Sequence, residues 1–189
     1  MPKTSSEPAA SCTRTTLHGP AMGTRWSATV ETDATQDLEA LRRDLAAAVE
    51  QVDAQMSPWK PDSDLMRLNR APVDAWVDLP AELLAVLDSA LEVQRLSAGA
   101  FDPCVGALVD AWGFGAVRDA PDAQAIHAAR QFPPRPGALE LDRATGRARK
   151  QAPVQLDLCG IAKGYAVDRM ATVLQQHGVT YTHVPYKGT

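Results

Sequence analysis

The sequence predicts an α+β fold in which helices pack on a largely antiparallel sheet. Segments with helical spacing of apolar residues and segments with strand-like alternation both occur, but they do not follow the regular strand-helix-strand order of a parallel sheet. With 189 residues, the chain is long enough for one domain with an apolar core, or for one domain and part of another. We expect the polar residues 1–20 to form a mobile arm and residues 21–189 to form the domain.

The clearest strand pattern lies in residues 21–32. Met22, Trp26 and Val30 fall on one face of this segment, while the other face is mostly polar or charged. The hairpin pattern predicts two strands around a turn at Thr145 and Gly146. The expected shorter strands are residues 73–79, 138–141, 148–151 and 154–158, and residues 179–189 permit a further one.

Helical spacing is most regular over residues 35–56, where apolar residues recur every three or four positions until Pro58 stops the helix. A short helix follows, with Asp62 or Ser63 as its N-cap and Asn69 near its end. The further expected helices are residues 80–96, 105–112, 121–130 and 160–177.

Composition excludes several classes of function. The net charge is −4 and no run of lysine or arginine occurs, so the sequence does not predict a nucleic-acid partner. No stretch has the length of a transmembrane segment. Three distant cysteines exclude a disulfide framework and do not have the spacing of a zinc site. Cys12 follows small residues, as at a lipoprotein cleavage site, but residues 1–11 lack the apolar core of a signal peptide.

The stretch most suggestive of function is residues 156–168, where an apolar strand end turns into a helix. A helix N-terminus beside Lys163 favours anions, because its backbone N–H groups lack partners within the helix. Gly164 lies early in this helix, where glycine costs roughly 1 kcal/mol relative to alanine. Such a glycine indicates close approach by another element or by a ligand. Local physics alone slightly favours packing.

Five motifs occur in a fixed order along the chain. They are Met22-Gly23-Thr24; Trp59 with residues 62–69; Gly99-Ala100-Phe101-Asp102-Pro103; residues 105–109 with Trp112-Gly113-Phe114-Gly115; and residues 157–168. Together they resemble the ApbE family of FAD:protein FMN transferases over about residues 22–178. Cys159 stands where this family often has glycine or serine.

The resemblance implies an enzyme that binds FAD and Mg²⁺, transfers FMN to a threonine or serine hydroxyl of an acceptor flavoprotein, and releases AMP. It implies no particular catalytic residue. The residues it assigns to FAD are Met22, Trp59, Ala100, Phe101, Asp102, Asp157 and Lys163, and it assigns Gly160 to the metal.

Each assigned residue also has a structural interpretation. Trp59 beside prolines suits the edge of a core about as well as a flavin, and Met22 fits packing on its strand. Asp102 before Pro103 is a common turn residue. Asp157 is harder to explain, because a carboxylate in an apolar strand end needs hydrogen bonds or a cation.

Members of the family continue past the position of Gly178 with a glycine-rich segment, and later with an aspartate and a threonine that complete the Mg²⁺ site. Residues 180–189 do not match that continuation, so we expect the C-terminal part of the fold to be missing and activity to suffer more than FAD recognition. The alternatives are an FAD-binding module without catalysis and a Mg²⁺-dependent FAD pyrophosphatase. The family implies the periplasmic face of the bacterial inner membrane, and the cytoplasm stays open as an alternative.

Overall fold

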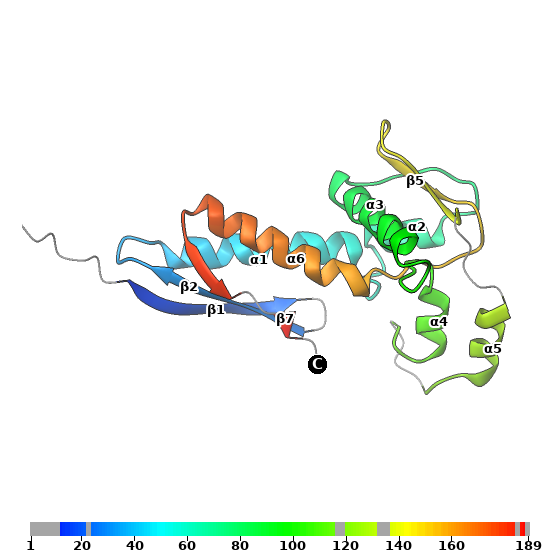
Figure 1. The fold of residues 1–189 in the computed structure, drawn as a ribbon, viewed down its shortest axis with the longest axis horizontal. Coiled ribbons are helices and arrows are strands. Elements are labelled where there is room, and N and C mark those ends of the chain that lie inside the picture. The colour runs from blue at the N-terminus through cyan, green and yellow to red at the C-terminus, as the bar shows by residue number, and fades with distance from the viewer. Residues whose placement is uncertain (1–11, 22–23, 116–119, 132–136, 184–185, 188–189) are drawn as a thin grey trace, which may run out of the picture. The chain divides into compact units, whose positions relative to one another are not determined.

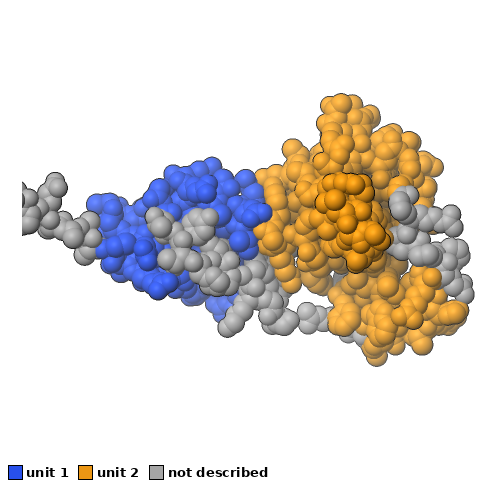
Figure 2. All heavy atoms as spheres, in the orientation of Figure 1, with its two compact units in different colours: residues 1–49, 167–189 blue, residues 50–166 orange. Residues whose placement is uncertain are grey.

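The structure is a computed structural model that describes residues 12–21, 24–115, 120–131, 137–183 and 186–187. The chain divides into two compact units, residues 1–49 with 167–189 and residues 50–166 (Figures 1 and 2). The division falls within two helices, α1 (Leu38–Met56) and α6 (Cys159–Gln176). Helices and antiparallel strands occur in both units, which confirms the predicted α+β class.

The sheet of the first unit is antiparallel. Its strands are β1 (Thr13–Ala21), β2 (Thr24–Thr32), β6 (Thr180–His183) and β7 (Tyr186–Lys187). They follow the order β1-β2-β6, and β7 also pairs with β2. Strand β1 corrects the expectation of a mobile arm at residues 1–20, because it pairs with β2 from Thr13 opposite Thr32 to Ala21 opposite Thr24. Residues 1–11 lie outside the described part of the chain.

The core of the first unit lies between this sheet and the parts of α1 and α6 that belong to the unit (Figure 1). The alternation predicted for β2 is confirmed, since Trp26, Ala28 and Val30 are at most 1% exposed. At the end of α6, the His177 Nε2 atom lies 2.9 Å from the Asp44 Oδ2 atom of α1. This pair joins the two helices within the unit.

The second unit contains the complete helices α2 (Asp64–Arg70), α3 (Ala81–Leu96), α4 (Gly106–Ala111) and α5 (Ala123–Gln131). Of the two predicted N-caps of α2, the structure selects Ser63, whose Oγ accepts the Met66 N–H at 3.2 Å. The same hydroxyl donates to the Ser57 carbonyl oxygen at 2.7 Å. Buried leucines of α2 and α3 supply most of the core around them.

The sheet of the second unit is small and antiparallel. Its strands are β3 (Val77–Asp78), β4 (Leu139–Asp142) and β5 (Arg147–Lys150), in the order β3-β5-β4. The predicted hairpin is confirmed, whereas the strand predicted at residues 73–79 is reduced to the two residues of β3. The strand predicted at residues 154–158 is wrong, because this extended segment has one isolated parallel bridge, from Gln155 to Val105.

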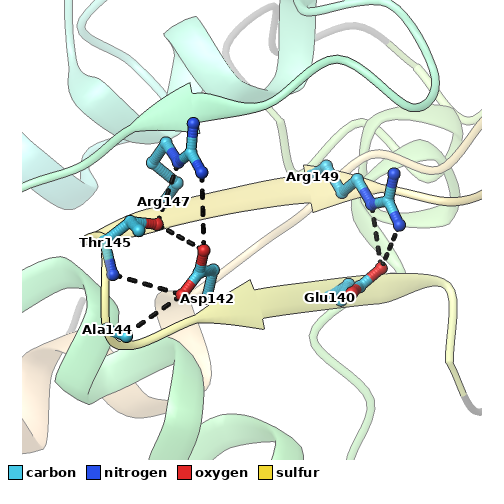
Figure 3. A network of polar contacts seen from close by, with 6 residues as sticks. All are labelled: Glu140, Asp142, Ala144, Thr145, Arg147 and Arg149. Carbon is cyan, nitrogen blue, oxygen red and sulfur yellow. Dashed lines mark hydrogen bonds and ion pairs between the residues drawn. The ribbon is translucent and has the colours of Figure 1, made fainter.

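Polar contacts hold the β4–β5 hairpin closed (Figure 3). Across the strands, Arg149 pairs with Glu140 at 2.8 Å and Arg147 with Asp142 at 3.5 Å. Asp142 also accepts the Thr145 N–H at 3.1 Å in the turn. The guanidinium carbons of Arg147 and Arg149 lie 5.4 and 4.6 Å from the centroid of a Trp76 ring, within cation–π range.

Candidate functional site

The candidate site is built around residues 155–157, the extended segment that precedes α6. Along one edge, Gln155 accepts the Gly106 N–H at 2.9 Å, and Asp157 donates its N–H to the Pro103 carbonyl oxygen at 2.8 Å. Along the other edge, both backbone groups of Leu156 bond to the Asn69 side chain at 2.8 and 3.0 Å. The segment is therefore held like a strand, although one neighbour is a loop and the other is a side chain.

Asp157 stabilises the start of α6. Its Oδ1 atom accepts the Cys159 N–H at 2.8 Å, which satisfies one of the N–H groups that lack a partner within the helix. The N–H groups of Ile161 and Ala162 bond to the Leu158 carbonyl oxygen at 2.9 and 2.8 Å. The Gly160 N–H has no acceptor in the part of the chain that the structure describes. An exposed N–H at this end of a helix is suited to an anion.

Phe101 lies against the backbone of Gly160. A Cβ atom at residue 160 would be 3.1 Å from the Phe101 Cε2 atom, so this glycine allows the aromatic ring to come close. The side chain of Asp102 closes a turn, because its Oδ1 atom accepts the Cys104 N–H at 2.8 Å. The loop that carries Phe101 and Asp102 is thus joined to the start of α6 by ring contact and by the bond from Asp157 to Pro103.

Asp110 is a second carboxylate in this region, and the sequence did not single it out. Although the residue as a whole is exposed, its carboxylate lies against Gly115, where an added Cβ atom would collide with it. Burial of the carboxyl group raises the pKa of Asp110, and the negative charge of Asp157 raises it further. The available signal was the pair of glycines in Trp112-Gly113-Phe114-Gly115, which indicates a tight turn against the preceding helix.

Two cysteines in this region have strongly raised pKa values. Burial, followed by the nearby carboxylate of Asp102, raises the pKa of the Cys104 thiol to about 12. Burial and then Asp157 raise the pKa of Cys159 to about 12, while the positive charge of Lys163 acts in the opposite direction. Both thiols are protonated at neutral pH and therefore poor nucleophiles. The effect on Cys159 also shows that Asp157 and Lys163 act on the same point.

Gly164 corrects a local expectation from the sequence. It is exposed, and a Cβ atom at this position would have no described atom of the protein within 4 Å. Packing by another element therefore does not explain this glycine in the described structure. Gly164 lies one helical turn after Gly160 on α6, and of the two only Gly160 faces the Phe101 ring.

Comparison with known proteins decides the family of the chain. The sequence model of the ApbE family matches residues 22–188. The chain belongs to the ApbE family. The FAD:protein FMN transferase of Klebsiella pneumoniae (strain 342) is 34% identical over 176 residues, which cover 89% of this chain and 49% of the relative. The chain spans about half the length of the curated relatives it matches.

Solved ApbE structures share the fold. The flavin transferase ApbE from Vibrio cholerae superposes with a TM-score of 0.85 at 29% identity, covering 94% of this chain and 58% of that one. The apo form of the Pseudomonas stutzeri flavinyl transferase ApbE gives a TM-score of 0.79 at 28% identity, covering 93% and 58%. The predicted ApbE-like fold is thereby confirmed.

The ApbE motif residues are brought together only in part. Phe101 contacts Gly160 at the start of α6, Asp157 caps this helix, and Lys163 follows within its first turns, while Asp102 lies in the loop next to Phe101 and bonds to Cys104. Ala100 is exposed beside Phe101. Trp59 is half-buried, and its backbone N–H donates to the Ser57 Oγ atom at 3.3 Å. Met22 lies outside the described residues. The assignment of these residues to FAD stays a prediction.

The cavities of the second unit lie beside these ApbE motifs. A small one of about 70 Å³ contains Asp157, Asp110 and Asn69 in its wall, together with Pro58, which precedes Trp59. This volume has room for only a few water molecules, so the cavity cannot enclose a molecule of the size of FAD. An apolar cavity of about 590 Å³ lies against α4 and α5, and none of the described residues assigned to FAD lines it.

Mg²⁺ fits the described oxygens of this ApbE chain to a limited extent. Among the described residues, no group of three or more His, Cys, Asp and Glu side chains could hold a metal ion. Mg²⁺ commonly takes only one or two carboxylates together with substrate phosphates, so Asp157 and Asp110 match its chemistry. A carbonyl oxygen in the first turn of a helix, as at Gly160, keeps a second lone pair for such an ion. The metal role of Gly160 stays a prediction.

In the described ranges, no helix is long and apolar enough to cross a membrane. The compartment in which this ApbE-family chain works stays a prediction.

Proposed function

We propose that the protein transfers FMN from FAD to a threonine or serine hydroxyl of an acceptor flavoprotein and releases AMP, in a Mg²⁺-dependent reaction. The observation that carries this proposal is the start of α6, where the Phe101 ring and Asp157 lie beside the Gly160 N–H, which has no acceptor among the described residues, within an ApbE-family fold. The names of the relatives, FAD:protein FMN transferase, support the same activity.

The diphosphate of FAD suits this point for electrostatic reasons. The positive end of the α6 dipole and the ammonium group of Lys163 both favour negative charge there. Gly164 is exposed and has no described side chain close to it, so a phosphate group can approach the helix backbone there. We expect Phe101 to offer its ring face or edge to an aromatic part of FAD.

The proposed reaction is a phosphoryl transfer. The acceptor oxygen forms a bond to the phosphorus atom of the FMN part, the bond from that phosphorus to the bridging oxygen breaks, and the bridging oxygen leaves with AMP. The proton of the acceptor hydroxyl is released. Bound Mg²⁺ would neutralise charge on the diphosphate. The contribution of the described residues is positioning and electrostatic stabilisation, since Asp157 and Asp110 would hold the metal and α6 with Lys163 would hold the phosphates.

One assay tests the proposal against its alternatives. The protein is incubated with FAD, Mg²⁺ and an acceptor domain that carries a target threonine, and the products are separated by gel and by chromatography. A flavin-labelled acceptor together with AMP supports the transferase. Free FMN and AMP without label would indicate an FAD pyrophosphatase. FAD-dependent thermal stabilisation without either product would indicate a binding module, and no stabilisation would contradict the FAD site itself.

A further inference from the structure

Asn69 is the only asparagine in the chain. Its side chain forms the backbone hydrogen bonds that a neighbouring strand would otherwise form with residues 155–157. Its Nδ2 atom donates to the Leu156 carbonyl oxygen at 3.0 Å, and its Oδ1 atom accepts the Leu156 N–H at 2.8 Å. The two residues are 87 positions apart in the sequence. An amide side chain is suited to this place because it offers one donor and one acceptor at the spacing of a neighbouring peptide group.

The polar groups of Asn69 bond to other residues of the protein. Besides its bond to Leu156, the Nδ2 atom lies 3.7 Å from the Met66 Sδ atom. The backbone carbonyl of Asn69, in the last turn of α2, accepts the Lys150 Nζ–H at 2.5 Å. Carbonyls at the end of a helix lack partners within it, so Lys150, which is 6% exposed, caps α2 and holds Asn69 from behind. Asn69 thus acts on its surroundings through Leu156.

Leu156 directly precedes Asp157, the residue that caps the start of α6. Its neighbour Asp157 bonds to Pro103 on one side and to the first N–H of α6 on the other. A shift of Leu156 would therefore move the Asp157 carboxylate and the start of α6 relative to the loop that carries Phe101. Within the described ranges, the N–H and carbonyl groups of Leu156 have no other hydrogen-bond partner than Asn69.

We propose that Asn69 is a positioning residue of the FAD site, which fixes Asp157 and the start of α6 by bonding both backbone groups of Leu156. This inference rests on the proposed function for what the site binds. It assigns no contact with FAD to Asn69. It also gives Lys150 the supporting task of keeping Asn69 in place.

The test variant is Asn69→Asp, which preserves size and the acceptor for the Leu156 N–H. It removes the donor to the Leu156 carbonyl and places a carboxylate against that oxygen. We expect the dissociation constant for FAD to rise about tenfold or more near neutral pH, the effect of one lost bond and one repulsive contact. A protonated aspartic acid has an O–H donor, so lowering the pH below about 3.9, the ordinary pKa of an aspartate, should bring the constant of the variant back toward that of the wild type.

The pH series is read as the ratio of variant to wild type, because other groups nearby also titrate. Asp110 and Asp157 line the same small cavity as Asn69, and Lys150 bonds to its carbonyl. A merely structural loss would not be restored by protonation of one residue. The control is Asp142→Ala in the hairpin turn, which removes the bond from Asp142 to the Thr145 N–H and has no part in the site. We expect it to lower stability without changing FAD affinity.

Hydrogen exchange of the Leu156 amide gives a readout that does not depend on FAD. We expect slow exchange in the wild type and faster exchange in Asn69→Ala, which removes the acceptor of the Leu156 N–H. Lys150→Met, which leaves Leu156 untouched, should also speed this exchange and serves if Asn69→Ala does not fold. Selective ¹⁵N labelling of asparagine gives one pair of side-chain amide signals, which reports directly on the bonded amide of Asn69.

The outcomes separate the inference from the proposed function. If the wild type does not bind FAD, the proposed function fails, whatever Asn69 does. If the wild type binds FAD and Asn69→Asp binds it equally well at every pH, the positioning role is overturned. Unchanged exchange of the Leu156 amide in Asn69→Ala would overturn the hydrogen-bond arrangement itself. Weaker FAD binding by Asn69→Asp that recovers on acidification, with faster Leu156 exchange in Asn69→Ala, supports the inference.

Discussion

At the scale of single residues, Gly160 and Gly164 form a matched pair on α6. Both are exposed and lie in the same helix, but only Gly160 has a neighbour in contact range, the Phe101 ring. A methyl group added at Gly160 requires the ring to move by a few tenths of an ångström, whereas one added at Gly164 meets no described atom. Alanine substitutions at the two positions therefore distinguish the effect of helix propensity on stability from the effect of a close contact with Phe101.

We predict that Gly164→Ala stabilises the protein. Alanine is favoured over glycine inside a helix by roughly 0.8–1 kcal/mol, and the described structure has room for the added methyl group. Urea unfolding should show an increase of about that size in the free energy of unfolding. A decrease would contradict the room that the described structure shows around residue 164.

We predict that Gly160→Ala weakens FAD binding although its helix propensity improves. The added methyl group lies 3.1 Å from Phe101 and displaces the ring, and it also narrows the approach to the Gly160 N–H. The measurement is an FAD titration of Gly160→Ala beside the wild type, with urea unfolding of both. Unchanged affinity with a displaced ring would show that Phe101 does not set the FAD site.

We predict that Cys104 and Cys159 react slowly with alkylating agents in the folded protein. Their pKa values are raised from 9.0 to about 12 by burial and carboxylates, so little thiolate exists at neutral pH, while Cys12 is exposed. Because the folded pKa lies above the unfolded one, the thiols contribute stability that is complete below about pH 9 and is lost between pH 9 and 12. Mass spectrometry after alkylation at about pH 8 should find Cys12 labelled first. Equal labelling of all three would contradict the burial.

At the scale of elements, α2 connects two parts of the site. Ser63 caps its start, next to the turn that carries Trp59, and its last turn carries Asn69. We predict that Ser63→Ala lowers the free energy of unfolding by roughly 0.5–2 kcal/mol, because the Met66 N–H loses its partner. The control is Asp62→Ala, which removes the other candidate N-cap at an exposed position. A larger loss from Asp62→Ala in urea unfolding would contradict Ser63 as the cap.

The sequence predicted the elements whose apolar residues recur with a regular period. It did not predict the structure of segments whose hydrogen-bond partners lie far away in the chain. The heptad-like spacing in α1 and the alternation in β2 report burial directly, and both elements occur close to the predicted bounds. Strand β1 was missed because its buried face has one large residue, Leu17, with Gly19 and Ala21. Residues 154–158 have the composition of a strand, but Asn69 and the loop at residues 103–106 occupy the places of neighbouring strands. No pattern in the sequence near residues 154–158 indicates that Asn69 and this loop are their hydrogen-bond partners.

The site was predicted by motif order and completed by geometry. The anion-friendly start of α6 follows from Gly160 and Lys163 in the sequence, whereas its link to Phe101 required the structure. Asp110 and Asn69 were missed, although both stand within or beside the quoted motifs. Asp110 is recognised by its raised pKa, to which Asp157 contributes, and Asn69 by its two hydrogen bonds to Leu156. In both cases the partner lies far away in the chain.

At the scale of the whole molecule, family membership and fold agree. The ApbE family model matches residues 22–188, and solved ApbE structures superpose over more than nine tenths of the chain. The chain spans about half of the curated relatives' length, so the complete reaction is a proposal for it. The part that is described holds the start of α6, on which the account of FAD binding depends.

The most direct measurement is an FAD titration in the presence of Mg²⁺, followed by flavin fluorescence, of the wild type, Lys163→Gln and Arg143→Gln. Each variant removes one positive charge, but Lys163 follows the start of α6 and Arg143 pairs with Asp88 near the hairpin turn. We predict that the wild type binds FAD, that Lys163→Gln binds it about tenfold more weakly, as expected for a lost bond to a phosphate, and that Arg143→Gln binds it normally. Equal affinity of the wild type and Lys163→Gln, or no binding by the wild type, would contradict an FAD diphosphate at the start of α6.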